Sequence, residues 1–428
     1  MMKLELGKIE IDDIQFAENT EIDNSILKVN KDELLEKIAD DRIVSIDLDI
    51  VRPGDSVRVI PVKDVIEPRV KVEGEGGIFP GFLADNKMVG EGRTHALKGA
   101  AVMTTGKIVG FQEGIVDMSG PGAEYTPFSK QNNLVITCEV EEDIKQHEHE
   151  EILRMVGLKA ASYLGETAKN VDPDTVESYE HKPYLEAANE YPELPKVGYV
   201  YMLQSQGLLH DTYVYGVDAK EIIPTTISPT EVMDGAIISG NCVSACDKNA
   251  TYIHQNNPVI EDLYKRHGKD INFMGIIISN ENVTLADKER SSNYVAKLAE
   301  EMGLDAAIVS EEGFGNPDAD LIMNCTKLED KGIKTVLITD EFAGRDGASQ
   351  SLADANPKAD AVVTAGNANM TVTLPPMDKV IGHQKFADVI AGGFDGSLNE
   401  DGSITVEIQA ITAATNELGF NKLTARGY

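Results

Sequence analysis

The alternation of apolar and polar positions changes character between the two halves of the chain. In the first half, short segments alternate with a period of two, which is typical of strands with one buried face; they cover residues 27–30, 42–51, 56–62 and 69–74. Glycine-rich stretches follow, and residues 142–166 carry apolar positions near helical spacing. The pattern predicts a mixed α+β first half.

The second half consists of uninterrupted apolar runs that alternate with helical stretches. The runs cover residues 271–279, 305–310, 334–339 and 360–366. Such runs suit strands that are covered on both faces, as in a parallel sheet built from βαβ units. We therefore expect an α/β protein whose C-terminal half, over about 255–400, is parallel, doubly wound and Rossmann-like. Residues 197–206 add another candidate for a buried strand.

Polar loops follow these predicted parallel strands. They are rich in carboxylates, amides and glycines, and they cover residues 279–283, 311–318, 340–346 and 366–370. Because ligands of such sheets gather beyond the carboxyl ends of the strands, the loops indicate a site for a small polar ligand. No GxGxxG fingerprint or phosphate-binding loop is present, so nucleotide binding is not indicated.

Charge and composition narrow the function further. The 428 residues carry 39 basic and 72 acidic side chains, for a net charge of −33. A surface this acidic repels nucleic-acid phosphates and anionic lipids, and no apolar run approaches the ~20 residues of a membrane span. Cysteines at 138, 242, 246 and 325 are too sparse for a disulfide framework. We expect free thiols and a cytoplasmic location.

One short segment, IISGNCVSAC at 237–246, holds two of these cysteines. The Cys242 thiolate has the chemistry to attack the carbonyl of Asn241, which would give a thioester by an N-to-S acyl shift. Gly240 supplies backbone freedom for the bent peptide that this attack requires, and Ser239 could hydrogen-bond the site. The segment is therefore a candidate for self-cleavage.

Three outcomes remain open from these residues. Elimination across Cys242 would cut the chain and, after hydrolysis, leave a pyruvoyl group at the new N-terminus. Hydrolysis of the thioester would instead leave an N-terminal cysteine, as in an N-terminal-cysteine amidohydrolase. In the third outcome Cys242 is an inert thiol in a turn of an uncut, non-catalytic scaffold subunit. Asn-Cys is a weak dipeptide signal, so the residues alone favour the inert thiol.

Other candidate residues carry weaker signals. Cys246 could assist ionisation of its neighbour, although a packed small side chain is the simpler interpretation. His210 stands next to Asp211 between apolar segments, where the pair could transfer protons or form a structural hydrogen bond. His147 and His149 lie two residues apart on a predicted helix and point in different directions, so we predict a solvated helix face and no metal site.

Longer blocks identify a resemblance. The chain resembles the component B proproteins of glycine, sarcosine and betaine reductases, and the similarity covers its whole length. It is carried by the blocks VKDVIEPRVKVEG, YVYMLQSQGLLHDTYVYGVDAK, PTEVMDGAIISGNCVSACDKN and EEGFGNPDADLIMNC. D-Proline reductase looks like a more distant relative of the same type.

The resemblance implies cleavage between Asn241 and Cys242, with Cys242 becoming a covalently bound pyruvoyl group. The products would be a mixed α+β chain, 1–241, and a pyruvoyl-bearing α/β chain, 242–428. The ketone would activate a substrate amine as an imine, so that a selenolate on a partner displaces nitrogen. The family is thus one of selenium-dependent reductive deaminases.

The resemblance also implies partners and a substrate class. The partners would be a substrate-specific selenoprotein subunit of component B, selenoprotein A, and a component C that forms acetyl phosphate. The substrate would be glycine, sarcosine or betaine. Glycine and sarcosine carry an N–H and can form the imine or iminium, whereas betaine is quaternary and cannot; glycine is the first choice.

Overall fold

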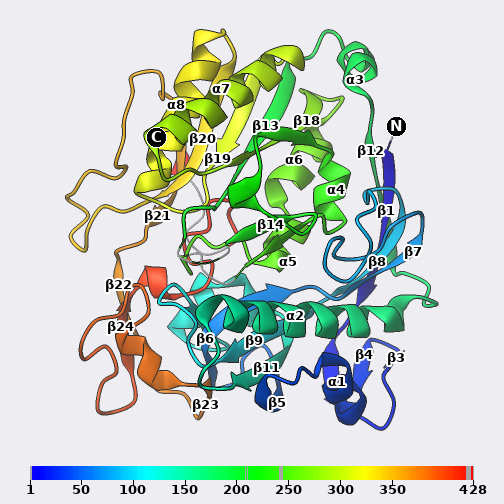
Figure 1. Ribbon diagram of the computed structural model, residues 1–428, viewed down its shortest axis with the longest axis vertical. Helices are drawn as coiled ribbons and strands as arrows, with labels where there is room; N and C mark the ends of the chain where they lie inside the picture. The colour runs from blue at the N-terminus through cyan, green and yellow to red at the C-terminus, as the bar shows by residue number, and fades with distance from the viewer. Residues whose placement is uncertain (1, 208, 210, 241–243, 421–425, 428) are drawn as a thin grey trace.

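The structure is a computed structural model that describes residues 2–207, 209, 211–240, 244–420 and 426–427. Figure 1 shows a helix-covered parallel sheet above a second layer of sheets, which the long helix α2 (Gln146–Gly165) crosses. The predicted mixed α/β class is confirmed, and so is the helix expected within residues 142–166.

The upper layer is a sheet of seven described strands. Their order is β16 (Thr225–Ile227), β18 (Asn272–Asn280), β13 (Lys196–Leu203), β19 (Ala306–Ser310), β20 (Lys334–Glu341), β21 (Val362–Asn367) and β25 (Arg426–Gly427). The strands from β18 to β21 are parallel, and β16 and β25 pair antiparallel at the edges.

Strand β13 occupies the middle of this sheet although it precedes residue 241. Its side chains alternate between two cores: Val200 and Met202 pack beneath helices α7 (Leu285–Glu301) and α8 (Asn316–Asp330), whereas Tyr199 and Tyr201 face the second layer. The buried strand expected over 197–206 is therefore confirmed. Because the sheet uses strands from both halves, the predicted division of the fold into two halves is not confirmed.

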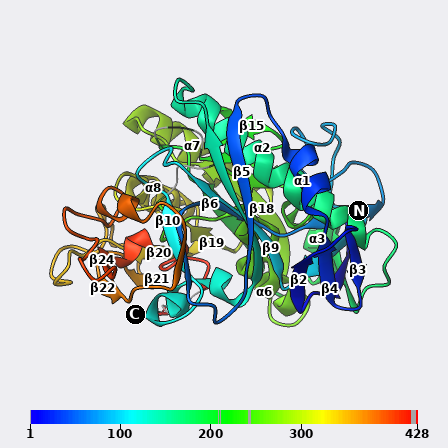
Figure 2. The same cartoon turned by 90° about the horizontal axis from the view of Figure 1, so that it is seen from below.

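The second layer contains two larger sheets. One is ordered β12 (Thr175–His181), β1 (Met2–Glu10), β8 (Gly92–Lys98), β7 (Arg69–Glu73). The other is ordered β10 (Gly114–Asp117), β6 (Val57–Ile66), β9 (Ala100–Gly106), β11 (Asn132–Val140), β5 (Ile43–Val51), and β23 (Lys379–Gly382) adds to β6. Figure 2 shows this layer from below.

Smaller elements complete the described fold. Small sheets are formed by β2 (Asp13–Phe16), β4 (Ile26–Val29) and β3 (Glu21–Asp23), by β15 (Val217–Asp218), β14 (Thr212–Val214) and β17 (Ile237–Ser239), and by β22 (Thr371–Leu374) and β24 (Ile404–Glu407). The remaining helices are α1 (Lys31–Ile38), α3 (Tyr184–Glu190), α4 (Pro229–Met233), α5 (Thr251–Gln255) and α6 (Pro258–Arg266).

The prediction of a solvated face for both histidines of α2 is wrong for His149. His147 is exposed, but His149 is buried because α2 lies flat across the sheet of β6 and β9. Burial, together with the nearby cations Lys63 and Lys107, lowers the pKa of His149 to about 4. This histidine is therefore a neutral core residue at physiological pH.

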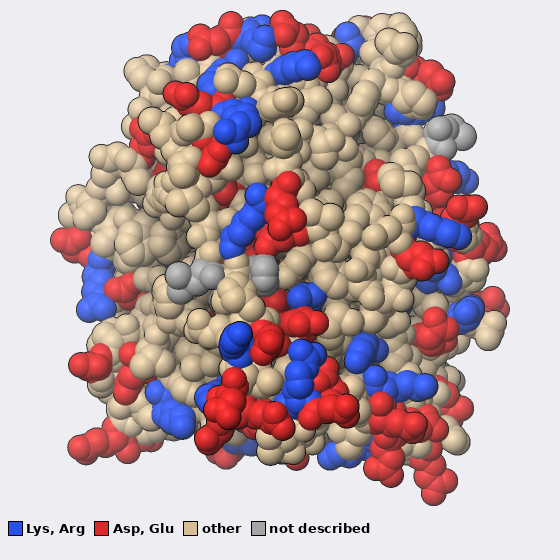
Figure 3. Space-filling view, viewed as in Figure 1, with Lys and Arg blue, Asp and Glu red and all other residues tan. Residues whose placement is uncertain are grey.

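The face of the molecule in Figure 3 carries acidic side chains that gather toward its lower edge, with lysines and arginines between them. Among the described residues, no helix has the length and apolar character needed to cross a membrane.

A buried arginine ties the second layer to the helices above it. Arg69 is 1 % exposed and donates to the Glu67 carboxylate (2.7 Å), to the Met233 and Gln255 carbonyls, and to the Asn256 side chain. Burial acts to raise the pKa of Glu67, but the adjacent Lys98 and Arg69 cations outweigh it and hold this pKa below its ordinary value. The Glu67 carboxyl is therefore ionised, and paired with Arg69, in the folded protein at neutral pH.

Arg69→Met should lower the free energy of unfolding by about 3–5 kcal/mol at neutral pH, because it removes one of the two cations that pair with the buried Glu67 carboxylate and takes the Arg69 donor from two buried carbonyls. The loss should shrink as pH falls through the pKa of Glu67, where the carboxylate no longer needs a cation. Urea denaturation measures both effects. The control is Arg93→Met, which removes a half-exposed pair with Glu5 and should cost less than about 1 kcal/mol. Equal losses in the two variants would contradict this account.

Candidate functional site

Hydrogen bonds to β14 and to the start of α5 hold the backbone of β17 just before the predicted cleavage position. Strand β17 pairs antiparallel with β14, and the Gly240 N–H donates to the Asp211 carbonyl oxygen at 2.5 Å. The Ser239 N–H donates to Thr251 Oγ1 at 3.0 Å, at the start of α5. Residues 239 and 240 thus have a defined conformation inside the protein, where both are buried.

The carbonyl oxygen of Gly240 accepts two hydrogen bonds. Lys248 Nζ donates at 2.7 Å and Ser239 Oγ donates at 2.9 Å. Lys248 is 3 % exposed, so its ammonium group has lost nearly all contact with water. A buried cation aimed at the carbonyl one residue upstream of Asn241 is the most direct electrostatic feature of this site.

Strand β6 supplies a buried carboxylate, Asp64, whose pKa responds to the charge of Lys248. Asp64 accepts from the Thr251 N–H (2.9 Å) and from Thr251 Oγ1 (2.6 Å). Burial raises the pKa of Asp64 to about 6, and the Lys248 charge limits the rise. A continuous hydrogen-bonded chain therefore runs from Asp64 through Thr251 to Ser239.

The backbone after residues 241–243 is held by the C-terminal segment of the chain. The carbonyl oxygens of Ala245 and Cys246 accept from the N–H groups of Ala413 (2.6 Å) and Thr415 (3.0 Å). The Asn416 amide donates to the carbonyl oxygens of residues 247 and 248, each at 3.2 Å. Ser244 and Cys246 are both buried.

This segment lies at the carboxyl ends of the parallel strands. Glu312, just after β19, accepts from the Asn249 N–H at 2.8 Å, and Asp340, near the end of β20, lies 3.9 Å from Cys246 Sγ. Numbered along the chain, the parallel strands follow the order 2-1-3-4-5, and sheets of this order bind ligands where the direction of winding reverses. The structure thus brings the predicted ligand loops and the predicted cleavage segment together.

The same region concentrates buried carboxyl groups. Burial, followed by repulsion from neighbouring carboxylates, raises the pKa of Glu281, Glu311, Asp340 and Glu417 well above the ordinary range. The pKa of Glu312 rises to about 8, chiefly through burial. Groups of this kind can hold protons at neutral pH and can exchange them with a bound substrate.

The predicted site residues divide into two groups. Ser239, Gly240 and Cys246 lie in the site just described, whereas Asn241, Cys242 and His210 lie outside the described residues. The neighbour of His210, Asp211, is fully buried, and burial raises its pKa to about 7. Its carboxylate accepts from the Gly207 N–H at 2.7 Å.

Glu312 and Asp340 lie in the predicted ligand loops 311–318 and 340–346, but sequence reasoning missed three other charged residues near this segment: Asp64, Asp247 and Lys248. A signal for two of them was present, since the polar run Asp-Lys-Asn directly follows Cys246. Cys246 was expected to be a packed small side chain; it is buried, but its sulfur faces the carboxylates of Asp247 (3.7 Å) and Asp340. Cys138 and Cys325 are buried free thiols in the core, as predicted.

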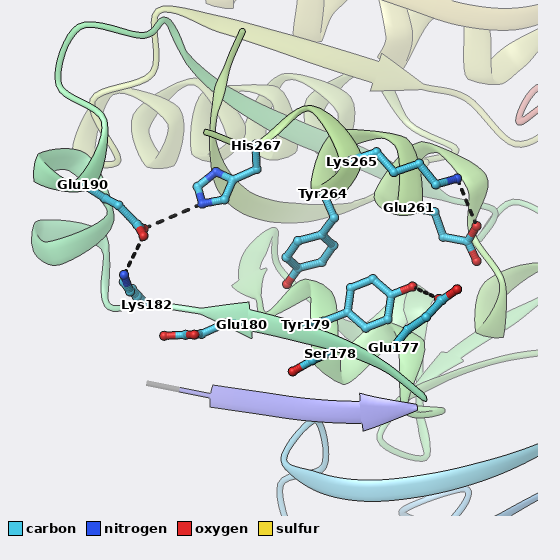
Figure 4. A pocket seen from close by; sticks show the side chains of 10 residues that line it. All are labelled: Glu177, Ser178, Tyr179, Glu180, Lys182, Glu190, Glu261, Tyr264, Lys265 and His267. Atoms are coloured by element: carbon cyan, nitrogen blue, oxygen red, sulfur yellow. Dashed lines mark hydrogen bonds and ion pairs between the residues drawn. The ribbon is translucent and has the colours of Figure 1, made fainter. Parts of the chain in front are cut away.

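A separate surface pocket of about 460 Å³ lies between β12 and α6 (Figure 4). Its charged side chains pair with one another: Glu190 with Lys182 at 2.6 Å, and Glu261 with Lys265 at 3.8 Å. None of the residues that hold Ser239, Gly240 or Cys246 lines it. The pocket therefore carries no part of the chemistry proposed for the cleavage segment.

Comparison with known proteins finds a matching protein family and several similar relatives. Residues 2–426 match the family model described as glycine/sarcosine/betaine reductase component B subunits. The chain is 69 % identical to "Glycine reductase complex component B subunits alpha and beta" of Acetoanaerobium sticklandii and 60 % identical to "Sarcosine reductase complex component B subunit alpha" of Peptoclostridium acidaminophilum, each over the full length of both chains.

A more distant relative is the "D-proline reductase proprotein PrdA" of Acetoanaerobium sticklandii, which is 22 % identical over 78 % of this chain and 54 % of its own. No solved structure matches the chain. The full-length identities and the family match together show that the chain belongs to the family of glycine/sarcosine/betaine reductase component B subunits.

Proposed function

We propose that this chain is the pyruvoyl-forming proprotein of a component B, cut between Asn241 and Cys242 into residues 1–241 and 242–428. One observation carries the proposal. The relative at 69 % identity is named as two subunits, alpha and beta, yet it corresponds to this single chain from end to end. A break in one polypeptide accounts for two subunits, and the distant relative is itself named a proprotein.

The cut follows from thiol chemistry at residue 242. The Cys242 sulfur attacks the Asn241 carbonyl carbon, and the peptide C–N bond breaks to give a thioester and a free amine. Elimination then breaks the Cβ–S bond, and the electron pair leaves with a thiocarboxylate that hydrolyses to carboxylate and sulfide. The remaining dehydroalanine hydrolyses to the pyruvoyl group and releases ammonia. Water is the other reactant, and no oxidant is needed.

The described residues support this chemistry by positioning. Lys248 and Ser239 hold the Gly240 carbonyl, and the Ser239 N–H is held by Thr251, so the peptide that enters residue 241 has little freedom. The positive charge of Lys248 also favours negative charge that develops on the adjacent backbone during attack. We assign Lys248 as a positioning residue for cleavage.

The mature site would act on an amine. A pyruvoyl ketone derived from Cys242 would supply an electrophile for the substrate amine and would weaken the C–N bond of that substrate. Near the described part of this segment, the buried carboxyl of Glu312 would offer a proton to the departing nitrogen, and the closed packing would limit access of water. Reduction would need selenolates from two partners, the substrate-specific selenoprotein subunit of component B and selenoprotein A. Component C would then form acetyl phosphate.

Glycine is the proposed substrate. The glycine reductase relatives are 69 % and 68 % identical to this chain, whereas the betaine reductase relative is 43 % identical. Glycine also carries the N–H that imine formation requires. The activity is therefore proposed as that of a selenium-dependent reductive deaminase, in which this chain supplies the amine-activating group.

Replacing Cys242 with alanine should abolish the cut, because alanine has no nucleophile to attack Asn241. Intact-mass analysis should show two fragments for the wild-type chain and one full-length chain for Cys242→Ala. Cys242→Ser should process slowly, since a hydroxyl can perform the same acyl shift. Cys325→Ala is the matched control, because it removes a buried thiol of the core beneath α7 and α8 and should leave cleavage unchanged.

The new terminus distinguishes the alternatives. A blocked terminus that borohydride converts to lactyl supports the pyruvoyl group. A free N-terminal cysteine would instead assign an N-terminal-cysteine amidohydrolase, and a wild-type chain that stays whole in active material would leave only the scaffold subunit.

Lys248→Met should slow cleavage by roughly tenfold to a hundredfold, because it removes a charge-assisted hydrogen bond of about 1.5–3 kcal/mol that holds the Gly240 carbonyl, one residue before the carbonyl that is attacked. Lys248→Arg should keep part of the rate. Fragment formation is followed by electrophoresis after synthesis of the precursor. Lys288→Met is the control: Lys288 is also 3 % exposed but pairs with Asp320, and its loss should leave the rate unchanged. Equal slowing in both variants would reduce the role of Lys248 to general stability.

The two fragments should remain associated after the cut. Strand β13 of the first fragment lies between β18 and β19 of the second, and β23 of the second pairs with β6 of the first. Size-exclusion chromatography should therefore give one peak that contains both fragments, and only denaturant should separate them. Spontaneous separation in native buffer would contradict the shared sheets.

A further inference from the structure

A sulfur and two carboxylates converge just downstream of the cleavage segment. Cys246 Sγ lies 3.7 Å from Asp247 Oδ1 and 3.9 Å from Asp340 Oδ2, and the three donor atoms lie within 4.8 Å of one another. Cys246 is completely buried, and both aspartates are 1 % exposed. The three side chains therefore face one another in the interior and not at the surface.

The two aspartates of this cluster have no cationic partner: in the described part of the chain, neither forms an ion pair with a lysine or arginine. Burial is the largest influence on the pKa of both carboxyls and raises each. Asp247 Oδ2 and Asp340 Oδ1 are buried and have no hydrogen-bond partner. Buried carboxylates are normally paired or bound to a metal, and each of these two aspartates has a buried oxygen that could face a cation.

The donor set and spacing match a small transition-metal ion. With a metal–sulfur bond of about 2.3 Å and metal–oxygen bonds of about 2.0–2.2 Å, tetrahedral coordination separates sulfur from oxygen by about 3.6 Å. The two observed separations exceed this by only a few tenths of an ångström. A thiolate ligand favours zinc-type ions over magnesium or calcium.

We propose that Cys246, Asp247 and Asp340 bind one divalent cation of the zinc type. The thiol gives up its proton on binding, and water completes the coordination. Thr415 Oγ1 donates to Asp340 Oδ2 at 2.8 Å and orients this ligand, as groups behind metal ligands commonly do. The sequence alone predicted no metal site. Cys246 and Asp247 are adjacent, but Asp340 follows 93 residues after Asp247, and the three fit no spacing motif.

The cation would have a structural task. It would join the segment that starts at Ser244 to the end of β20, so this segment would stay in place whether or not the chain is cut. Binding does not require cleavage. The site can therefore be tested in Cys242→Ala chain, which also removes Cys242 as a competing thiol.

The experiment uses the full chain, as wild type and as Cys242→Ala, purified anaerobically. Inductively coupled plasma mass spectrometry should find about one equivalent of zinc-type metal per chain. After the metal is removed, titration of Cys242→Ala with Co²⁺ should produce a thiolate-to-cobalt charge-transfer band and should raise the melting temperature.

Ligand variants in the Cys242→Ala background complete the test. Cys246→Ser should abolish the band, and Asp340→Asn should weaken Co²⁺ binding at least about tenfold. Cys325→Ser should keep both band and affinity. Absence of metal together with absence of a band would overturn the proposal and leave a cluster of protonated acids, and so would a band that persists in Cys246→Ser. Because metal is counted in the uncut chain, failure here is distinct from failure of pyruvoyl formation.

Discussion

The hydrogen bond from Lys248 to the carbonyl oxygen of Gly240 is the contact on which the arrangement of this site depends. It spans residues 241–243, so it joins the last described residue before them to a side chain beyond them. Thr251 adds a second link, because it accepts from the Ser239 N–H while Asp64 of β6 holds its hydroxyl. Residues 239 and 240 are thus hydrogen-bonded both to β14 and to the downstream residues Lys248 and Thr251. A peptide held in this way can react with its own neighbour without further ordering, which is how enzymes lower the entropic part of a barrier.

Burying carboxyl groups costs free energy, and this fold buries several of them in one place. Glu281, Glu312 and Asp340 lie at the carboxyl ends of β18, β19 and β20 in the same parallel sheet, and each has a raised pKa. Such groups are tolerated if they are protonated or if a cation is bound. The two proposals use one solution each. In the proposed function, protonated Glu312 would serve an amine that leaves; in the proposed metal site, a cation bound at Asp340 would fix the segment that begins at Ser244.

The strands of the upper sheet could be predicted from sequence, because uninterrupted apolar runs such as 271–279 and 334–339 are typical of strands buried on both faces. The polar loops that follow them were also found, since a parallel sheet places such loops at one edge. The network around residue 240 could not be predicted: Asp64 reaches Thr251 across 187 positions, and nothing local to either residue indicates the pairing. His149 illustrates the same limit, because its burial depends on the direction in which α2 crosses the sheet.

The position of β13 constrains the order of events. This strand precedes residue 241 but lies between β18 and β19, and its residues from Val197 to Tyr201 pair with both neighbours. A fragment that ended at residue 241 would have to insert its strand into the middle of a sheet made by another chain, whereas a continuous precursor forms the same pairing within one molecule. Lys248, Ser239 and Thr251 likewise come together at residues 239 and 240 only in the folded chain. If the chain is cut as proposed, folding would therefore precede the cut, and the intact precursor would be the state in which the sheet is built.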